Sequence, residues 1–450
     1  MGNKIKSGNE LIAQEFGVEI KAEETKDQPL GYDISKFRPI TLAELTRILG
    51  LTIKRDETNK IITFLAQLSA YTEDSQVNVS FNAPSSTGKS FIPLEVVSLF
   101  PSEDVVKLGN CSPTAFYHEQ GEYDKETNTI KVDLSRKIII FLDQPSSQLL
   151  ERMRSLLSHD EKEIKAKITD KSQKGGNRTK TVVIKGFPTV IFCTAGLRLD
   201  EQEATRFLLL SPEINSEKIR EAILEKIKKE TDSVGYKDAT LADPERRLLK
   251  ERILAIKEAN VKEIKLSNPK LVEEMFLKNI KTVKPRHQRD IARVISLIKV
   301  LALLNMWFRQ KEGEAIVANE DDVKEAFKIW DAISESQELN LPPYVLNLYK
   351  DVILEAYKGV RRGLNRQEIM KKHFEVYGRF LPDWQLRQWI IPMLETSGLI
   401  TQDADPIDKR KILISPTSEL TNSENNSELG GGVEKDIVSQ AKKIFGEGDK

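Results

Sequence analysis

Cysteine and histidine are scarce in this chain of 450 residues, and the chain has no net charge. The two cysteines, Cys111 and Cys193, form no CxxC pair, and the four histidines stand far apart, so the sequence offers neither a disulfide framework nor a metal-ligand spacing. Such usage fits a reducing cytoplasm. The 69 basic and 69 acidic side chains cancel, which argues against one broad basic face that would coat nucleic acid or a membrane.

Long apolar runs are missing as well. The longest apolar stretch, Ile291 to Phe308, is interrupted by Arg293 and Lys299, which predicts a buried helix rather than a membrane span. The first residues contain no apolar core of signal-peptide length. We therefore expect a protein whose partners do not include a membrane.

Strand-like and helix-like stretches alternate in the first half of the chain. The short apolar runs VNVSF, KIIIFL and TVIFCTA are typical of strands buried on both faces of a parallel sheet, and stretches with helical spacing separate them. This pattern predicts an α/β core. The predicted order is a flexible arm, the α/β core, a helical segment without strands, a compact mixed segment and a disordered tail, over residues 1–40, 41–213, 214–340, 341–416 and 417–450.

A phosphate-binding motif follows the first of these strands. The pattern G-x-x-x-x-G-K-[ST] is matched, with alanine at its first position, by Ala83-Pro84-Ser85-Ser86-Thr87-Gly88-Lys89-Ser90. A predicted strand precedes the motif and a predicted helix follows it, which is the context the motif requires. Gly88 lets the backbone approach a phosphate closely, and Lys89 places charge on the β- and γ-phosphates. With a hydroxyl for Mg²⁺ from Ser90, the sequence predicts an ATP site with Mg²⁺.

A second acidic strand comes farther along the chain, where KIIIFL is followed by Asp143 and Gln144. Ligands of α/β sheets bind at the carboxyl ends of the strands, so Asp143 is predicted to hold Mg²⁺ through water. Gln144 stands where an ATPase usually has glutamate, and a glutamine orients water but takes no proton. The catalytic base therefore stays open, since the spacing selects neither of the spare carboxylates, Asp160 and Glu203.

Two further polar residues are candidates for the ATP site. Thr194 ends the TVIFCTA strand, where it either positions the attacking water or simply terminates the strand. Arg206, followed by Phe207, is a candidate arginine finger that offsets charge on the γ-phosphate held by a neighbouring subunit. The alternative for Arg206 is a surface salt bridge, and the residues alone leave both interpretations open.

A basic hairpin is predicted between the Asp143 strand and the Thr194 strand. Two β-prone arms flank a tip from Lys174 to Arg178 that contains Gly-Gly and Gly-Asn, which are hairpin signals. From Lys162 to Lys185 eight basic residues oppose two acidic ones, a net charge of +6. Such a hairpin is either a solvated surface or a grip on nucleic-acid phosphates. The candidate DNA contacts are Lys171, Lys174, Arg178 and Lys180.

In this order, the runs APSSTGKS, IIIFLDQP, LLSHDEKEIKAKITDK, GFPTVIFCTA and EATRF resemble the AAA+ ring helicases of the MCM-like class. The resemblance is closest to versions carried by bacterial mobile elements and covers residues 75–335. It implies a ring, a hexamer in that family, whose hairpin before the sensor 1 strand enters the central channel and grips DNA. By similarity, Thr194 takes the sensor 1 role and Arg206 is the finger, whereas Gln144 departs from the family pattern.

The resemblance also includes a helical lid and, after it, a further domain. The family's helical lid carries a sensor 2 arginine that contacts nucleotide, and both Arg289 and Arg293 suit that role. Residues 341–416 are similar to a winged helix, with Lys409, Arg410 and Lys411 on a two-stranded wing. Winged helices bind DNA or partner proteins.

Three functions follow as hypotheses. The leading one is an ATP-dependent DNA helicase or translocase that works as a ring in mobile-element DNA replication. The second is an initiator or helicase loader, an ATP switch that binds duplex DNA without translocating, which Gln144 favours because it implies slow hydrolysis. The third, a remodelling protein whose hairpin grips polypeptide, ranks last because the tip lacks the aromatic and hydrophobic residues that hold an extended peptide.

Overall fold

The computed structural model of the chain describes residues 32–118, 121–124, 126–127, 129–170, 178–195, 205–278, 280, 282–360 and 362–417. Most of the predicted N-terminal arm and almost all of the predicted C-terminal tail lie outside the described residues. Among the described helices, none combines the length and apolar character that crossing a membrane requires.

The centre of the molecule is a five-stranded sheet in which every neighbouring pair is parallel. Its strands are β1 (Val79–Asn82), β2 (Val105–Leu108), β5 (Ile138–Phe141), β8 (Thr189–Thr194) and β9 (Leu208–Leu210). The order across the sheet is β2-β5-β8-β1-β9. The three strands predicted from continuous apolar runs, β1, β5 and β8, are confirmed, and β8 lies between the other two.

Both faces of β5, β8 and β9 are buried, which explains why these three strands show no polar alternation. In β5, Ile138 and Ile140 pack into one hydrophobic cluster, while Ile139 and Phe141 pack into another. The second cluster contains α5 (Ser147–Leu157). The first contains α2 (Leu42–Gly50), α3 (Glu57–Ser69), α4 (Phe91–Val97), α9 (Pro244–Ala259), α10 (Pro269–Leu277), α11 (His287–Leu304) and α12 (Glu320–Asp331).

The β9 edge of the sheet is closed by a side chain. Gln337, in α13 (Ser334–Glu338), is buried, and its Nε2 donates to the Leu209 carbonyl at 2.9 Å. Its Oε1 accepts from the Leu209 N–H at 3.1 Å. The amide of Gln337 thus satisfies the one β9 residue that turns its backbone groups away from β1.

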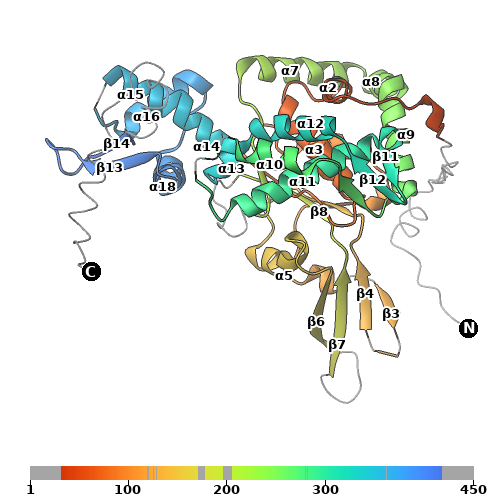
Figure 1. Cartoon of the computed structure of the whole chain (residues 1–450). Helices are drawn as coiled ribbons and strands as arrows, with labels where there is room; N and C mark the ends of the chain where they lie inside the picture. Colours follow the sequence, from red (N-terminus) through yellow and green to blue (C-terminus); the bar gives the residue numbers. More distant parts are fainter. Residues whose placement is uncertain are drawn as a thin grey trace, which may run out of the picture.

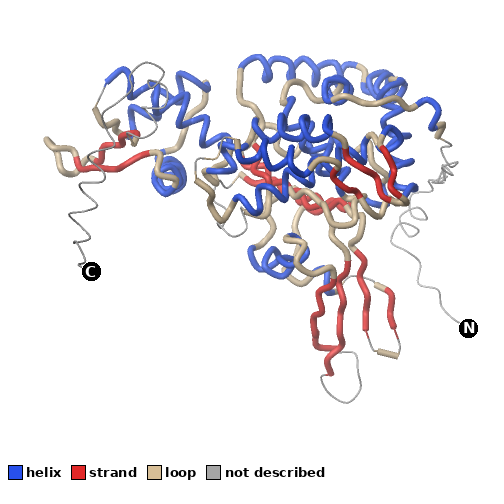
Figure 2. Tube along the Cα trace, viewed as in Figure 1, coloured by secondary structure: helices blue, strands red, loops and turns tan. Residues whose placement is uncertain are grey.

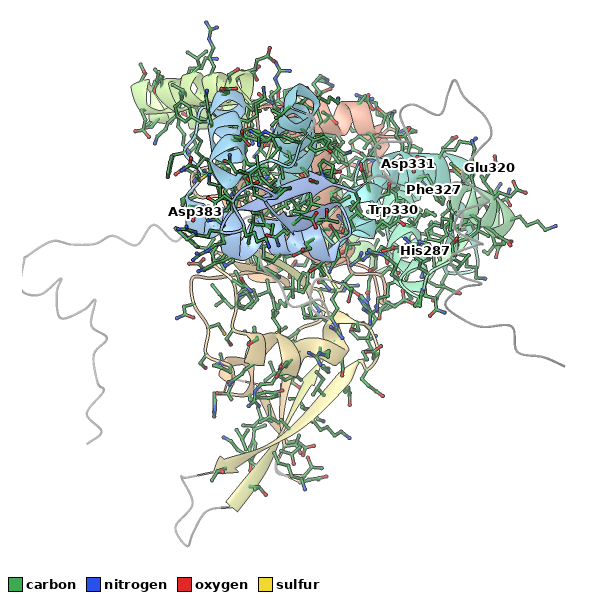
Figure 3. All side chains as sticks on the ribbon, turned by 90° about the vertical axis from the view of Figure 1, so that its left-hand side faces the viewer. His287, Glu320, Phe327, Trp330, Asp331 and Asp383 are labelled. Carbon is green, nitrogen blue, oxygen red and sulfur yellow. The ribbon has the colours of Figure 1, made fainter. Side chains whose placement is uncertain are left out.

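A second sheet projects from the body, below it in Figures 1 and 2 and again in the perpendicular view of Figure 3. Its order is β3-β4-β7-β6. The predicted basic hairpin is confirmed as β6 (Glu163–Asp170) paired antiparallel with β7 (Arg178–Lys185). A second hairpin, β3 (Glu122–Asp124) and β4 (Thr129–Asp133), lies beside it and was not expected from the sequence. One edge of the projection therefore comes from the chain between β2 and β5.

The segment predicted to be helical over 214–340 contains strands, so the expectation of a strand-free segment is wrong. Besides α7 (Ser216–Thr231), α8 (Ser233–Ala242) and α9 to α13, it holds a three-stranded sheet of β10 (Ile264–Leu266), β12 (Ala315–Ala318) and β11 (Gln310–Glu312). These strands have only three or four residues, too few for a period of two to stand out from the sequence.

Residues 341–416 form a C-terminal unit with its own hydrophobic cluster. A continuous helical run from Pro343 to Val360 opens it, as α14 (Pro343–Leu348), η5 (Tyr349–Leu354) and α15 (Glu355–Val360). Next come α16 (Arg366–Tyr377), α17 (Asp383–Gln385), η6 (Leu386–Ile390) and α18 (Ile391–Thr396). The antiparallel pair β13 (Ile400–Ala404) and β14 (Ile412–Pro416) ends the unit, and the three basic residues Lys409, Arg410 and Lys411 lie in its turn.

Candidate functional site

The phosphate-binding loop, residues 83–90, lies between β1 and α4, at the carboxyl edge of the central sheet. Gly88 has φ +92°, a conformation that favours glycine, and a Cβ built there would meet no atom within 4 Å, so the space beside this part of the backbone is open. Within the loop, Lys89 Nζ and Thr87 Oγ1 donate to the Pro84 carbonyl at 3.0 and 2.9 Å. The loop is thus a concave cradle closed by its own side chains.

A cavity of about 880 Å³ opens from this loop. Its walls are the loop residues Ser85 to Gly88, Thr52 to Lys54 and Asp56 of the α2–α3 connection, part of α7, and Tyr377 to Arg379 of the C-terminal unit. A ligand pocket of several hundred cubic ångströms accommodates a molecule of nucleotide size. Lys218 of α7 forms an ion pair with the buried Asp56, which fixes α7 as one wall.

The strand order brings the predicted polar residues to this loop. Because β8 lies between β1 and β5, Thr194 at the end of β8 stands between the loop and the residues that follow β5. Its Oγ1 donates to Gln144 Oε1 at 3.0 Å, and its carbonyl accepts from the Ala83 N–H at 3.3 Å. Asp143 is exposed beside Gln144. One hydrogen-bonded connection therefore links the loop, Thr194 and Gln144.

Lys89 in the loop and Cys193 beside it have shifted pKa values. The pKa of the Lys89 ammonium is lowered, first by burial and then by the positive charge of Arg379, although Cys193 and Asp143 oppose this. Burial raises the pKa of the Cys193 thiol to about 11, so it is a neutral thiol near pH 7 and donates to the Lys89 carbonyl at 3.4 Å. Cys193 is therefore a packing residue here and not a nucleophile.

The residues present fit Mg²⁺ bound together with a nucleotide. No group of three or more His, Cys, Asp or Glu side chains in the described ranges is placed to hold a metal by itself. Mg²⁺ commonly takes one or two protein ligands, several waters and phosphate oxygens. Ser90, at the start of α4, and Asp143, after β5, are the protein groups that would hold it.

The predicted finger, Arg206, lies near the amino-terminal ends of the strands, whereas the phosphate-binding loop lies at their carboxyl ends. Leu208 pairs with Val79, so Arg206 stands about 20 Å from the loop along the strand direction, at roughly 3.3 Å per residue. This exceeds the reach of an arginine side chain. Arg206 is half-buried, and its Nε donates to Ser158 Oγ at 2.7 Å, just beyond α5.

The two sensor 2 candidates accompany Arg206 instead of lining the cavity. Arg289 Nη1 donates to Thr205 Oγ1, and Arg293 Nη2 donates to the carbonyls of Thr205 and Phe207 at 2.6 and 2.9 Å. Burial lowers the pKa of the Arg293 guanidinium to about 10, which leaves it charged at neutral pH. Any nucleotide contact by either arginine would therefore involve a second subunit.

The spare carboxylates do not resolve the catalytic base. Asp160 follows His159, whose Nε2 is 3.1 Å from Oε1 of Gln76, a residue that precedes β1. Asp160 thus lies at the amino edge of the sheet, away from the phosphate-binding loop of its own chain. Glu203 lies outside the described residues.

Only part of the predicted DNA contact set can be placed. Lys171 and Lys174 lie outside the described residues, as does the side chain of Arg178. Lys180 is half-buried near the start of β7. On β6, Lys165 and Lys167 are exposed on one face, and Ile164, Ala166 and Ile168 pack on the other. Lys165 and Lys167 were not among the predicted DNA contacts, although the two-residue alternation of β6 marks them.

A phosphate-binding loop between strand and helix, an acidic strand end and a polar strand between them define a P-loop nucleotide-binding domain. Residues 43–258 match the model of a family described as "MTBMA_p00010 P-loop domain". The chain is similar to an uncharacterized protein, MTBMA_p00010, from Methanothermobacter marburgensis, with 23% identity over 364 residues. The match covers 73% of this chain and 42% of that protein, so the chain spans less than half the length of this relative.

These comparisons support a P-loop NTPase and extend no further. The family match begins in α2 and ends in α9, so it includes the central sheet and the projecting sheet. Neither similarity carries a DNA-related activity.

Proposed function

We propose that the chain is a DNA-dependent ATPase that works as a ring of subunits, as a helicase or translocase of the MCM-like AAA+ type in mobile-element replication. In this proposal residues 214–340 act as the lid, and the C-terminal unit acts as a winged helix whose wing presents Lys409 to Lys411. The order of strands around the phosphate-binding loop and the hairpin inserted before β8 support it.

The observation that carries the proposal is the projecting basic hairpin. Lys165 and Lys167 are exposed on β6 and form no ion pair with a described residue, although Lys162 pairs with Glu73 and Lys185 with Asp133. Unpaired lysines on a projection that leaves the body are suited to contact a phosphate backbone.

The chemistry follows from the loop and its neighbours. Lys89 binds the β- and γ-phosphates, and Thr194 holds Gln144 so that its amide orients the attacking water. Mg²⁺, when bound, would neutralise charge on the phosphates. Arg206 is too far from the phosphate-binding loop of its own chain to reach it. It is therefore suited to contact the γ-phosphate of a nucleotide bound by a neighbouring subunit, and that geometry favours a ring.

Charge reversal on the hairpin tests the proposal. In the double variant Lys165→Glu/Lys167→Glu, we expect basal ATP hydrolysis to persist and its stimulation by single-stranded DNA to fall about tenfold or more. The log–log salt dependence of DNA binding should become shallower by about 1.4 if both lysines contact single-strand phosphates. ATPase rates with and without DNA, and DNA anisotropy over several salt concentrations, measure both effects.

A matched control makes the same charge change elsewhere. Lys324 and Lys328 are exposed on α12, in the body of the molecule, and their reversal should leave DNA stimulation intact. An equal loss of DNA stimulation in both double variants would show that the effect comes from the change in net charge and not from the hairpin. Unwinding of a forked duplex by the wild type, in single turnover with Mg-ATP, separates translocation from mere binding.

One observation favours a second function. Gln144 stands at the position where a catalytic carboxylate is expected, and its Oε1 accepts a hydrogen bond from the Thr194 hydroxyl. A glutamine at this position suits slow hydrolysis. An ATP-switched initiator or helicase loader needs no fast turnover. It predicts ATP-dependent binding to duplex DNA with very low turnover, whereas fast DNA-stimulated hydrolysis would exclude it.

A further inference from the structure

An arginine of the C-terminal unit reaches the phosphate-binding loop. Arg379, between α16 and α17, donates from Nη1 to the Ser85 carbonyl at 2.9 Å. Lys89 Nζ donates to the adjacent carbonyl of Pro84 at 3.0 Å. Two cations from distant parts of the chain therefore bind neighbouring carbonyls of the same loop, and one of them is the residue that grips nucleotide phosphates.

Arg379 has donors to spare. Among the described residues no carboxylate lies within salt-bridge distance of it, whereas Arg362 and Arg366 in the same unit are paired with Glu368 and Asp383. A guanidinium offers five N–H donors, and the bond to Ser85 uses one. Arg379 also lines the cavity at the loop, where its charge acts on Lys89. An unpaired guanidinium there is matched by a polyphosphate.

The segment that carries Arg379 is held in place by buried hydrogen bonds. Gly378 ends α16 with φ +62°, which turns the chain toward the loop. The Arg379 carbonyl is 3.0 Å from Nδ1 of the buried His373, and His373 Nε2 is 3.0 Å from the Tyr344 hydroxyl. Because a carbonyl only accepts, Nδ1 carries the proton, and Nε2 accepts from Tyr344.

The same network returns to the strand that precedes the loop. The Tyr344 N–H donates to Ser211 Oγ at 3.0 Å, and the Ser211 hydroxyl donates to the Asn82 carbonyl at 2.6 Å. Asn82 is the last residue of β1. The C-terminal unit is thus tied to both ends of one short stretch, at Asn82 through Ser211 and at Ser85 through Arg379.

We propose, resting on the nucleotide site proposed above, that Arg379 is a phosphate-contacting residue supplied in cis by the C-terminal unit, and that it exchanges the Ser85 carbonyl for the β-phosphate of the bound nucleotide, a group that ATP and ADP share. Binding of a nucleoside polyphosphate then strengthens the docking of the C-terminal unit. By reciprocity, any ligand that moves this unit changes the affinity for nucleotide by the same factor.

Nucleotide titrations of the full chain test this assignment. In Arg379→Ala we expect the Kd values of fluorescent ATP and ADP to rise about tenfold or more, as for loss of a charge-assisted hydrogen bond, with binding of AMP unchanged. Arg379→Lys should recover part of the affinity, because the charge remains. Added ADP should slow hydrogen exchange at residues 378–382 in the wild type and not in Arg379→Ala.

The matched control is Arg387→Ala, which removes an exposed arginine of the same unit that does not line the cavity, and should bind like the wild type. Lys89→Ala separates the two proposals. If the wild type binds ATP no better than Lys89→Ala, the nucleotide site itself is wrong. If Lys89→Ala loses binding while Arg379→Ala keeps it, or if Arg379→Ala weakens AMP as much as ATP, the role of Arg379 is overturned.

Discussion

At the scale of single residues, Gln144 stands beside the phosphate-binding loop where an ATPase usually has glutamate. Its Oε1 accepts from Thr194, which leaves the second lone pair of that oxygen and the amide NH2 for a water molecule. An amide positions water but provides no base, and the nearby thiol of Cys193 stays protonated because burial raises its pKa to about 11. A nucleotide bound at the loop would therefore find no general base in either Gln144 or Cys193.

Replacing this amide by a carboxylate should accelerate hydrolysis. In Gln144→Glu, the Thr194 hydroxyl can donate to the new carboxylate as it does to the amide oxygen, and the second oxygen can accept a proton from water. General base catalysis contributes on the order of a hundredfold, so we expect kcat to rise about tenfold or more with little change in nucleotide affinity. Steady-state ATPase assays would show this, with Gln144→Ala as the slower control. An unchanged kcat in Gln144→Glu would mean that the base comes from elsewhere.

At the scale of elements, α16 carries a buried titratable group. The pKa of His373 is lowered, chiefly by burial and also by the charge of Arg379, while the Arg379 carbonyl opposes the shift. Tyr344 and Tyr377 face the same ring, and the Tyr377 hydroxyl donates to Asp351. The neutral imidazole is the form that this environment stabilises.

Acidification should therefore loosen the protein through His373. The unfolded chain takes up this proton near pH 6.5, above the lowered folded pKa, so stability is full above that pH and declines as the pH falls further. We expect the free energy of unfolding to drop by up to about 1.4 kcal/mol per pH unit more in the wild type than in His373→Gln. Urea unfolding at pH 7.5 and 5.5 measures this. Parallel declines in the two proteins would show that His373 does not titrate on unfolding.

Strong local signals made some elements predictable. The strand around Ile138 is a continuous apolar run, and the sequence of β6–β7 combines β-prone arms with a Gly-Gly pair between them. The three short strands of the 264–318 region gave no such signal. For Arg289 and Arg293 the helix was predictable, but the edge of the sheet on which α11 packs depends on tertiary contacts. Arg379 was missed because only the folded chain brings it to Ser85.

At the scale of the whole molecule, Lys89 and Arg206 lie at opposite ends of the strands of one sheet, Lys89 at the carboxyl ends and Arg206 at the amino ends. If Arg206 is the finger proposed above, a complete site needs two chains, one that provides the loop and one that provides the finger. Lys89→Ala should lose nucleotide binding, and Arg206→Ala should bind nucleotide but hydrolyse it about a thousandfold more slowly, as for loss of an arginine finger.

Mixing these two inactive variants tests the arrangement directly. In assemblies formed at a 1:1 ratio, about a quarter of the interfaces would combine an intact loop from one chain with an intact Arg206 from the other, so ATPase activity should return. Arg289→Ala mixed with Arg206→Ala is the control, because both changes lie on the same side of the interface. No recovery on mixing, with assemblies verified by mass, would mean that Arg206 does not act across chains.

The Gln337 amide described above has a consequence for how such chains can meet. β9 has three residues, and the single peptide pair that faces outward, at Leu209, is already occupied by the glutamine side chain. This margin of the sheet offers no template for adding a neighbour's strand. Any assembly on this side would therefore proceed through side-chain surfaces, which can close into a finite circle, and not through backbone ladders, which tend to grow without end.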